Sequence, residues 1–362
     1  MDILVIGNGF DLAHGLKTTY RDFLTSCRNN ENQSFNEEFC KTNLWLRHFI
    51  KRQNDIGNTW IDLEKEIYRV ITKIYKFRNW NGNNNNSGHL LKINRSINEF
   101  NLDEIYSYIN QDYLNKDCKN KGYTLDIYKD SKHYFYAYFE SFKGFINFLY
   151  DQLREFTNVF SNYLNNDVLS LLPTNSPYSL SLSNNNHLYV LSFNYTDTCE
   201  RLYGKMFSFR SYYVHGNIGC KNGCNLVLGT YSFDNKPQNE NPRSAIPYEF
   251  NVFRKHNQRH KYGTIEDYQN LLKELTKYGK VIKPVFHVIG HSLDETDKNI
   301  LEHLFLINQN AIINIYYHNE EAQENYINNI TDIIGEKEVM TRVRLIYQHD
   351  KTRGILKEKV NV

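Results

Sequence analysis

The chain has 362 residues, of which 40% are hydrophobic and 15% aromatic, so it can bury a sizeable core and belongs to the globular class. Its 43 basic residues nearly balance 41 acidic ones, and a net charge of +2 excludes a chain-wide field that would recruit nucleic acid or an anionic membrane. No run approaches the roughly 20 apolar residues of a membrane span, and the six scattered cysteines do not resemble a secreted disulfide framework, so we expect a cytoplasmic protein with reduced thiols.

The first predicted element is a buried strand at residues 2–6, which ends at Gly7-Asn8-Gly9 and passes into a short helix. A continuous apolar run bounded by glycine is typical of a parallel sheet covered on both faces. Glycines let the backbone approach a ligand closely, and the N-terminus of the helix would favour a phosphate there. The turn is therefore a candidate nucleotide site. Because Leu12 stands where a dinucleotide fingerprint requires its third glycine, a plain turn with Asp11 as a cap is the alternative.

The next stretch predicts a large helical insertion at residues 31–172. Apolar residues recur at helical spacing in residues 35–75, 102–114 and 133–164. Residues 79–88 contain four consecutive asparagines and predict a loop between two helical parts. Residues 173–186 are rich in Ser, Asn and Pro and predict a connector back to the core.

Strand patterns resume after the connector, and helical patterns alternate with the last three of them. The strand-like runs are residues 188–193, 211–214, 226–228, 284–289, 311–317 and 342–347, and the helical patterns are residues 265–278, 295–308 and 320–334. This alternation predicts an α/β, Rossmann-like fold with a mostly parallel sheet. Residues 1–30 and 187–350 would form this nucleotide-binding core, followed by a C-terminal tail at residues 351–362.

Small, polar and titratable residues directly follow four of the predicted strands. These stretches are Gly7-Asn8-Gly9-Phe10-Asp11, Ser192-Phe193-Asn194-Tyr195-Thr196-Asp197, Val214-His215-Gly216-Asn217 and Ile289-Gly290-His291-Ser292-Leu293, the last followed by Asp294 and Asp297. Parallel strands place their ligand contacts at their carboxyl ends. We therefore expect the four stretches to converge on one cleft.

Several of these stretches resemble the AbiH family of bacteriophage abortive infection proteins. The opening stretch from Gly7 to Leu16, with Thr19-Tyr20-Arg21-Asp22-Phe23, is similar to the opening signature of that family. Residues 60–64, 191–196 and 289–293 resemble further blocks of it. The likeness extends over the whole chain and implies a role in defence against phage.

The order of the motifs also resembles, more distantly, the sirtuin-like NAD-binding fold of several phage-defence NAD hydrolases. The matching features are the glycine turn, Asn194, His215-Gly216, and Gly290 with Ser292. The paired C-x-x-C zinc module of sirtuins is missing, which argues against a protein deacylase and leaves a hydrolase or a nucleotide sensor open.

This resemblance implies which residues contact the nucleotide. Gly7, Asn8 and Gly9 would cradle the pyrophosphate, and Gly290, His291 and Ser292 would hold the adenosine half. Phe10, Arg21 and Asp197 complete the implied ligand contacts. For Arg21 the alternative is an ion pair on a solvated face, the usual environment of an exposed arginine.

The resemblance also implies a catalytic set of Asn194, His215 and Asp11. Cleavage of the bond between nicotinamide and ribose passes through an oxocarbenium-like state, so the site must orient water and stabilise positive charge. The Asn194 amide would hold the water, and His215 would accept a proton. Asp11 or Asp197 would orient partners or stabilise the cation.

Each assignment has a structural alternative. Asn194 would instead cap a helix that begins near Thr196, and His215 would be a buried structural histidine. His291-Ser292 would form a turn with Asp294 as an N-cap, and His14-Gly15 would end a helical turn. Glu64 would be a site carboxylate or a surface residue.

Two other features do not predict a site. Cys220 and Cys224 with His215 are too few ligands for a zinc site, so we expect no metal. The basic cluster at residues 254–261 has no interleaved aromatic residues, so it predicts a solvated surface or a lid rather than a nucleic-acid contact.

The sequence thus leads to one main hypothesis and two alternatives. The main one is an abortive infection effector that hydrolyses NAD or a related nucleotide to nicotinamide and ADP-ribose when an unknown phage trigger acts. It requires no cofactor beyond that substrate, and its apolar stripes would suit a homo-oligomer. The first alternative is a nucleotide-binding sensor without turnover, and the second is an RNA-targeting toxin.

Overall fold

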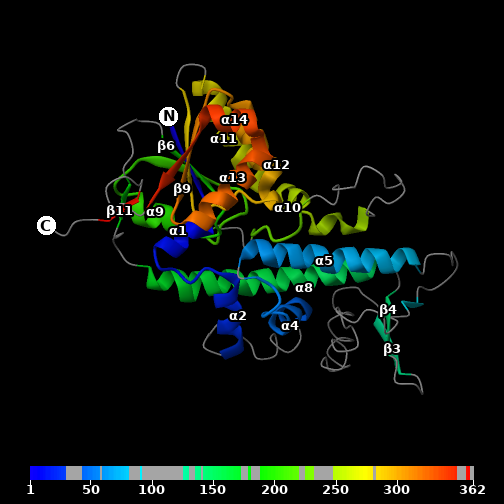
Figure 1. Cartoon of the computed structure of the whole chain (residues 1–362). Helices are drawn as coiled ribbons and strands as arrows, with labels where there is room; N and C mark the ends of the chain where they lie inside the picture. Colours follow the sequence, from blue (N-terminus) through cyan, green and yellow to red (C-terminus); the bar gives the residue numbers. More distant parts are fainter. Residues whose placement is uncertain are drawn as a thin grey trace. The chain divides into compact units, whose positions relative to one another are not determined.

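A computed structural model of the chain describes residues 1–29, 43–57, 59–80, 90–91, 125–129, 135–139, 142–172, 178–180, 188–219, 225–231, 248–279, 283–348 and 356–358. The chain divides into two compact units, many of whose elements are labelled in Figure 1. The sheet unit comprises Met1–Thr19, Ser161–Tyr231 and Gln258–Val362, and the helical unit comprises Tyr20–Phe160 and Ser232–Asn257.

The sheet unit is built on a six-stranded sheet in which every neighbouring pair of strands is parallel. Its strands are β1 (Asp2–Ile6), β6 (Leu188–Ser192), β7 (Phe209–Tyr213), β8 (Val285–Ile289), β9 (Ile312–Tyr317) and β10 (Val343–Tyr347). Their order is β10-β9-β8-β1-β6-β7. The chain winds from β1 toward β7 and then from β8 toward β10, which is the doubly wound Rossmann order with its switch point between β1 and β8. The predicted α/β, Rossmann-like fold is confirmed.

Alternate residues of β1 pack into separate cores because successive side chains of a strand point to opposite faces. Ile3 and Val5 pack with α11 (Thr264–Gly279), α12 (Lys298–Ile307) and α13 (Glu320–Ile334). Leu4 and Ile6 pack with α1 (Asn8–Ala13) and α9 (Thr198–Tyr203). A strand buried on both faces therefore requires the unbroken apolar run that the sequence has.

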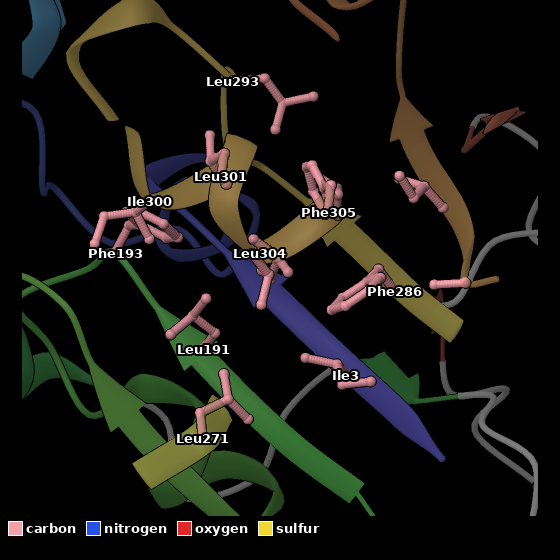
Figure 2. Packing of buried hydrophobic residues seen from close by; sticks show 14 of the residues in the cluster. Ile3, Leu191, Phe193, Leu271, Phe286, Leu293, Ile300, Leu301, Leu304 and Phe305 are labelled. Atoms are coloured by element: carbon pink, nitrogen blue, oxygen red, sulfur yellow. The ribbon is translucent and has the colours of Figure 1, made fainter. Parts of the chain in front are cut away.

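The core that contains Ile3 is shown in Figure 2, where strand side chains meet those of α12. Ile3, Leu191 and Phe286 are completely buried, as are Leu304 and Phe305. The rings of Phe286 and Phe305 meet edge to face, with centroids 5.3 Å apart. Each such side chain contributes about 1.5–3 kcal/mol through burial.

Five of the six strand runs expected after the connector form strands, and the sixth does not. Residues 226–228 belong to no strand. The Val227 N–H donates to the His215 carbonyl 2.8 Å away, and the Gln258 side chain bonds both the N–H and the carbonyl of Leu228. A side chain thus takes the place of a neighbouring strand.

Further short elements complete the sheet unit. They are η1 (Leu164–Val168), η2 (Leu169–Leu171), η5 (Glu295–Asp297), α14 (Glu336–Arg342), and the antiparallel pair β5 (Tyr178–Leu180) and β11 (Leu356–Glu358). Helix α10 (Lys255–Tyr262) begins in the helical unit and ends in the sheet unit.

Helix α13 begins with a side-chain cap that provides a test of local stability. The Asn319 Oδ1 accepts a hydrogen bond from the Ala322 N–H at 2.7 Å. We expect Asn319→Ala to lower the free energy of unfolding by about 1 kcal/mol, because one N–H at the helix start loses its partner. Urea denaturation measures the change. The control is Asn325→Ala in the middle of the same helix, which should be neutral or slightly stabilising; equal losses in both variants would contradict the capping role.

The helical unit contains α2 (Tyr20–Asn29), α4 (Leu44–Lys51), α5 (Trp60–Trp80), most of α8 (Phe142–Tyr163) and η4 (Tyr248–Phe253). Its aromatic core includes Phe23, Trp45, Phe49 and Phe156, all completely buried. The Trp45 ring N–H donates to the Leu149 carbonyl at 2.8 Å. None of the helices within the described residues combines the length and hydrophobicity needed to cross a bilayer.

The predicted helix at residues 133–164 is wrong over its first part. Residues Phe135–Phe139 form strand β4, which pairs with β3 (Leu125–Lys129) and β2 (Leu90–Leu91) in an antiparallel sheet. The run Phe-Tyr-Ala-Tyr-Phe consists mainly of aromatic residues, which favour strands when a partner strand is available. The predicted helix at residues 102–114 and most of the loop at residues 79–88 lie outside the described residues.

Candidate ligand site at the carboxyl edge of the sheet

The turns after β1 and β8 meet at the switch point of the sheet through their backbones. The Gly7 N–H donates to the Ile289 carbonyl at 3.2 Å, and the Gly9 N–H donates to the Gly290 carbonyl at 2.8 Å. A Cβ on Gly7 would lie 2.6 Å from the Cα of His291, and one on Gly9 would lie 2.7 Å from the Cα of Gly290. These glycines are therefore required by the close approach of two backbones, whether or not a ligand also contacts the turn.

Asp11 lies on α1 and is 1% exposed. Its Oδ2 accepts a hydrogen bond from the Thr196 hydroxyl at 2.6 Å, and the Thr198 hydroxyl donates to that of Thr196 at 3.1 Å. Burial raises the pKa of the Asp11 carboxyl to about 6, although the two threonines and Asn194 act in the opposite direction. A carboxyl with this pKa can hold or release a proton near neutral pH.

Asn194 follows β6 and is 4% exposed. Its amide lies within hydrogen-bonding reach of Asp11 and lowers the pKa of that carboxyl, but within the described residues neither amide atom makes a hydrogen bond of good geometry. The same is true of the Asp11 Oδ1. Helix α9 begins only at Thr198, with Asp197 at its cap position, so the capping alternative for Asn194 is wrong. We call Asp11, Asn194, Thr196 and Thr198 the Asp11 cluster.

A second group of side chains surrounds His215, which lies two residues beyond β7. The His215 Nε2 is 2.9 Å from the Asp297 Oδ1, and the Arg259 Nη2 is 3.0 Å from each of these atoms. The His291 Nε2 is 3.8 Å from the Asp297 Oδ2. All four residues are more than nine-tenths buried. We call them the His215 cluster.

The chain neighbours of Asn194 contact the His215 cluster. The Phe193 ring centroid is 4.2 Å from that of His291 and 5.5 Å from that of His215, and the Tyr195 ring is 6.0 Å from His215. The Phe193 N–H also donates to the Ile6 carbonyl at the end of β1. The four stretches therefore contact one another at this edge, and Phe193 and Tyr195, the chain neighbours of Asn194, reach the His215 cluster. That the four stretches line one cleft stays a prediction.

The remaining predicted ligand contacts have varied surroundings. The Phe10 ring is completely buried, 4.6 Å from the His14 ring. Asp197 pairs with Arg201 at 2.6 Å on α9, and Ser292 is exposed. Arg21 belongs to the helical unit, where it donates to the Gln53 carbonyl at 3.3 Å. Their roles as ligand contacts stay predictions.

Two local alternatives from the sequence are confirmed. The Asp294 carboxylate caps η5 by accepting from the Thr296 N–H at 3.1 Å. His14 is the C-cap residue of α1, and Gly15 follows with a φ of 77°. His14 also bonds the Phe10 carbonyl and the Tyr203 hydroxyl, both at 2.7 Å.

Arg259 was missed as a site residue because it lies in the basic cluster at residues 254–261. That cluster forms α10, and Arg259 is buried against Asp297, so the solvated interpretation is wrong for this residue. In the helical unit, Lys255 is likewise buried in a 2.7 Å ion pair with Glu64, which is therefore not a surface residue. No sequence signal distinguishes these two basic residues from their exposed neighbours.

A metal site finds no support among the described residues, which contain no group of three metal-ligating side chains. Cys220 and Cys224 lie outside the described part of the chain.

The doubly wound sheet and the buried polar clusters at its carboxyl edge define an α/β protein of the Rossmann-like class with a candidate ligand site. A family model described as "Bacteriophage abortive infection AbiH" matches residues 3–318, and the chain belongs to this family. Membership supports a role in abortive infection by phage. A comparison with curated proteins gave no match.

Proposed function

We propose that this protein binds NAD or a related dinucleotide at the carboxyl edge of its sheet and, when triggered during phage infection, hydrolyses it to nicotinamide and ADP-ribose. The observation that carries the proposal is the set of unpartnered polar atoms on Asp11 and Asn194, both buried at the carboxyl edge of the sheet. The family membership supports the defence role but does not specify the reaction.

The unpartnered atoms carry a cost that a ligand would offset. A buried polar group without a hydrogen bond costs about 1–3 kcal/mol. Three such atoms on two neighbouring side chains are a large penalty in a folded protein, and native structures contain few. A carboxylate oxygen accepts from a hydroxyl or a water, and an amide both donates and accepts. The set therefore suits a sugar hydroxyl together with a water.

The reaction requires a water at C1′ of the nicotinamide riboside. The C1′–N bond breaks and its electron pair leaves with nicotinamide, while the water oxygen forms the new bond to C1′ and releases one proton. Asn194 holds the water, and the ionised Asp11 carboxylate accepts the proton and stabilises the developing cation. His215 accepts a hydrogen bond from a ribose hydroxyl, which stabilises the positive sugar ring.

The purified full chain is tested by incubation with NAD and measurement of free nicotinamide. We expect Asn194→Ala and His215→Ala to lower turnover by about 10²-fold or more, since general acid–base groups contribute 10²–10⁴-fold. The matched controls are Asn270→Ala on α11 and His318→Ala after β9, both exposed. Turnover that survives both site substitutions would overturn the catalytic assignment.

A second experiment tests activation by phage, because infection supplies the trigger. It measures the NAD pool in infected cells that produce the full chain. We expect the NAD pool to fall in cells with the unmodified protein and to persist in cells with Asn194→Ala. Protection against phage with an unchanged NAD pool would contradict the proposal. Binding of NAD without turnover in either setting would favour the nucleotide-sensor alternative, and RNA degradation that survives His215→Ala would favour the toxin alternative.

A further inference from the structure

We propose that His14 and Tyr203 are positioning residues, which hold the Asp11 carboxyl in its cluster by joining α1 to α9. Asp11 lies on α1, whereas Thr196 and Thr198 lie just before and at the start of α9. The hydrogen bond between Asp11 and Thr196 therefore forms only while the two helices stay together. The catalytic consequence rests on the proposed function, whereas the positioning of Asp11 does not.

Helix α1 is too short to be stable by itself. It has six residues, and its N-cap residue, Gly7, makes no side-chain hydrogen bond. Isolated helices shorter than about 12–15 residues are marginal in water, so the position of α1 depends on its contacts with the rest of the sheet unit. The Gly9 N–H bonds the Gly290 carbonyl at the N-terminal end. His14 makes the contact at the C-terminal end.

His14 joins the end of α1 to α9 through both of its ring nitrogens. The Nδ1 is 2.7 Å from the Phe10 carbonyl oxygen, and the Nε2 is 2.7 Å from the Tyr203 hydroxyl. A carbonyl oxygen only accepts hydrogen bonds, so the Nδ1 carries a proton. Burial lowers the pKa of His14 and so favours the neutral ring, whose Nε2 accepts from Tyr203. One side chain thus bonds the backbone of α1 and the last residue of α9.

The rings of Phe10, His14 and Tyr203 also pack on one another. Phe10 and Tyr203 are completely buried, and His14 is buried as well. The His14 ring centroid is 4.6 Å from that of Phe10 and 5.7 Å from that of Tyr203. We call these three residues the His14 junction. Because Phe10 directly precedes Asp11 in the chain, a shift of the junction would displace the carboxyl.

Separation of the two helices would change the proton affinity of Asp11. Burial raises the pKa of this carboxyl to about 6 and outweighs the hydrogen bonds that act in the opposite direction. Asp197 and the Cys199 thiol are titratable groups that interact with it, and both lie at the start of α9. Loss of the junction would therefore lower the pKa of Asp11 toward its ordinary value of 3.8.

Two substitutions of His14 separate its two hydrogen bonds. The amide nitrogen of an asparagine can replace the Nδ1 as donor to Phe10, and the amide oxygen of a glutamine can replace the Nε2 as acceptor from Tyr203. The pKa of Asp11 is followed by NMR of the full chain with ¹³C-carboxyl-labelled aspartate, assigned by comparison with Asp11→Asn. We expect this pKa to fall well below 6 in His14→Asn and in Tyr203→Phe, and to stay near 6 in His14→Gln.

Tyr268→Phe is the matched control, because it removes another buried tyrosine hydroxyl that contacts a histidine of a neighbouring helix. The Tyr268 hydroxyl is 2.8 Å from the His303 Nδ1 and joins α11 to α12 in the other core of the sheet unit. Thermal unfolding should show similar losses of stability in Tyr268→Phe and Tyr203→Phe, whereas the Asp11 pKa should fall only in the latter. An unchanged pKa in Tyr203→Phe, or an equal fall in Tyr268→Phe, would overturn the positioning role.

The unmodified protein provides a test that does not depend on the folding of Tyr203→Phe or His14→Asn. In the full chain with ¹⁵N-labelled histidine, assigned by comparison with His14→Gln, we expect the neutral His14 ring to carry its proton on Nδ1. A neutral ring with its proton on Nε2 would overturn the proposal, because the Nδ1 could not donate to the Phe10 carbonyl and the Nε2 could not accept from Tyr203.

Turnover separates this proposal from the proposed function. If the protein hydrolyses NAD, His14→Asn should lower kcat by about 10–10²-fold with little change in KM, because Asp11 would be displaced from the reacting water. The double variant with Tyr203→Phe should be no slower than His14→Asn alone, since both changes break one hydrogen bond. Additive losses would overturn the positioning role. The expected pKa changes without any NAD turnover would refute the proposed function and leave the role of the His14 junction established.

Discussion

Gly290→Ala is expected to destabilise the sheet unit by roughly 2–5 kcal/mol, through backbone strain and steric overlap together. Gly290 has a φ of 63°, a conformation that costs a residue with a Cβ about 1–2 kcal/mol. The new Cβ would also overlap the Phe10 nitrogen and the Gly9 carbonyl carbon. These are backbone atoms of the opposing turn, so neither can move aside without disrupting the junction of β1 and β8.

Gly15→Ala is the matched control, because Gly15 also has a positive φ, 77°, but a Cβ there would meet no atom within 4 Å. It should show only the conformational cost of about 1–2 kcal/mol. Thermal and urea unfolding of both variants measure the difference. Equal midpoints for the two would mean that the contact between the turns contributes nothing to stability.

Asp11→Asn is expected to remove a pH-dependent loss of stability. The unfolded carboxyl releases its proton near the ordinary pKa of 3.8, whereas the folded one retains it up to about pH 6 because it is buried. Between these values the folded protein binds more protons, so raising the pH lowers the free energy of unfolding. The stabilisation is present below pH 3.8 and is lost as the pH rises through 6. The total is on the order of 2–3 kcal/mol.

The measurement compares unfolding of the unmodified protein and Asp11→Asn from pH 4 to pH 8. The variant should gain roughly 2 kcal/mol on the unmodified protein over this range, and it should lose NAD turnover under the proposed function. Asp332→Asn on the exposed face of α13 controls for the loss of one negative charge. A constant difference between Asp11→Asn and the unmodified protein at all pH values would show that Asp11 does not titrate as its burial implies.

The strands that end in polar residues could be predicted from the sequence, because the apolar run that marks each strand lies within the strand's own residues. The apolar run at residues 2–6 and the strands near residues 188, 285, 312 and 343 all formed as expected. Burial on both faces imposes a continuous apolar run, which needs no knowledge of the partner strands. The predictions for residues 135–139 and 226–228 were wrong because their structure depends on distant partners. Residues 135–139 form a strand by pairing with β3, and residues 226–228 bond to the Gln258 side chain instead of a neighbouring strand.

The sequence by itself determined the α/β class, the glycine turn at the switch point, and the presence of Asn194, His215 and Gly290 at strand ends. The tertiary structure alone decided which of these groups interact. It placed Asp11 with Asn194 and Thr196, and it brought Arg259 and Asp297 to His215 from distant parts of the chain. Strand patterns depend on near neighbours in the chain, whereas hydrogen bonding and burial of a charge depend on residues that only folding brings together.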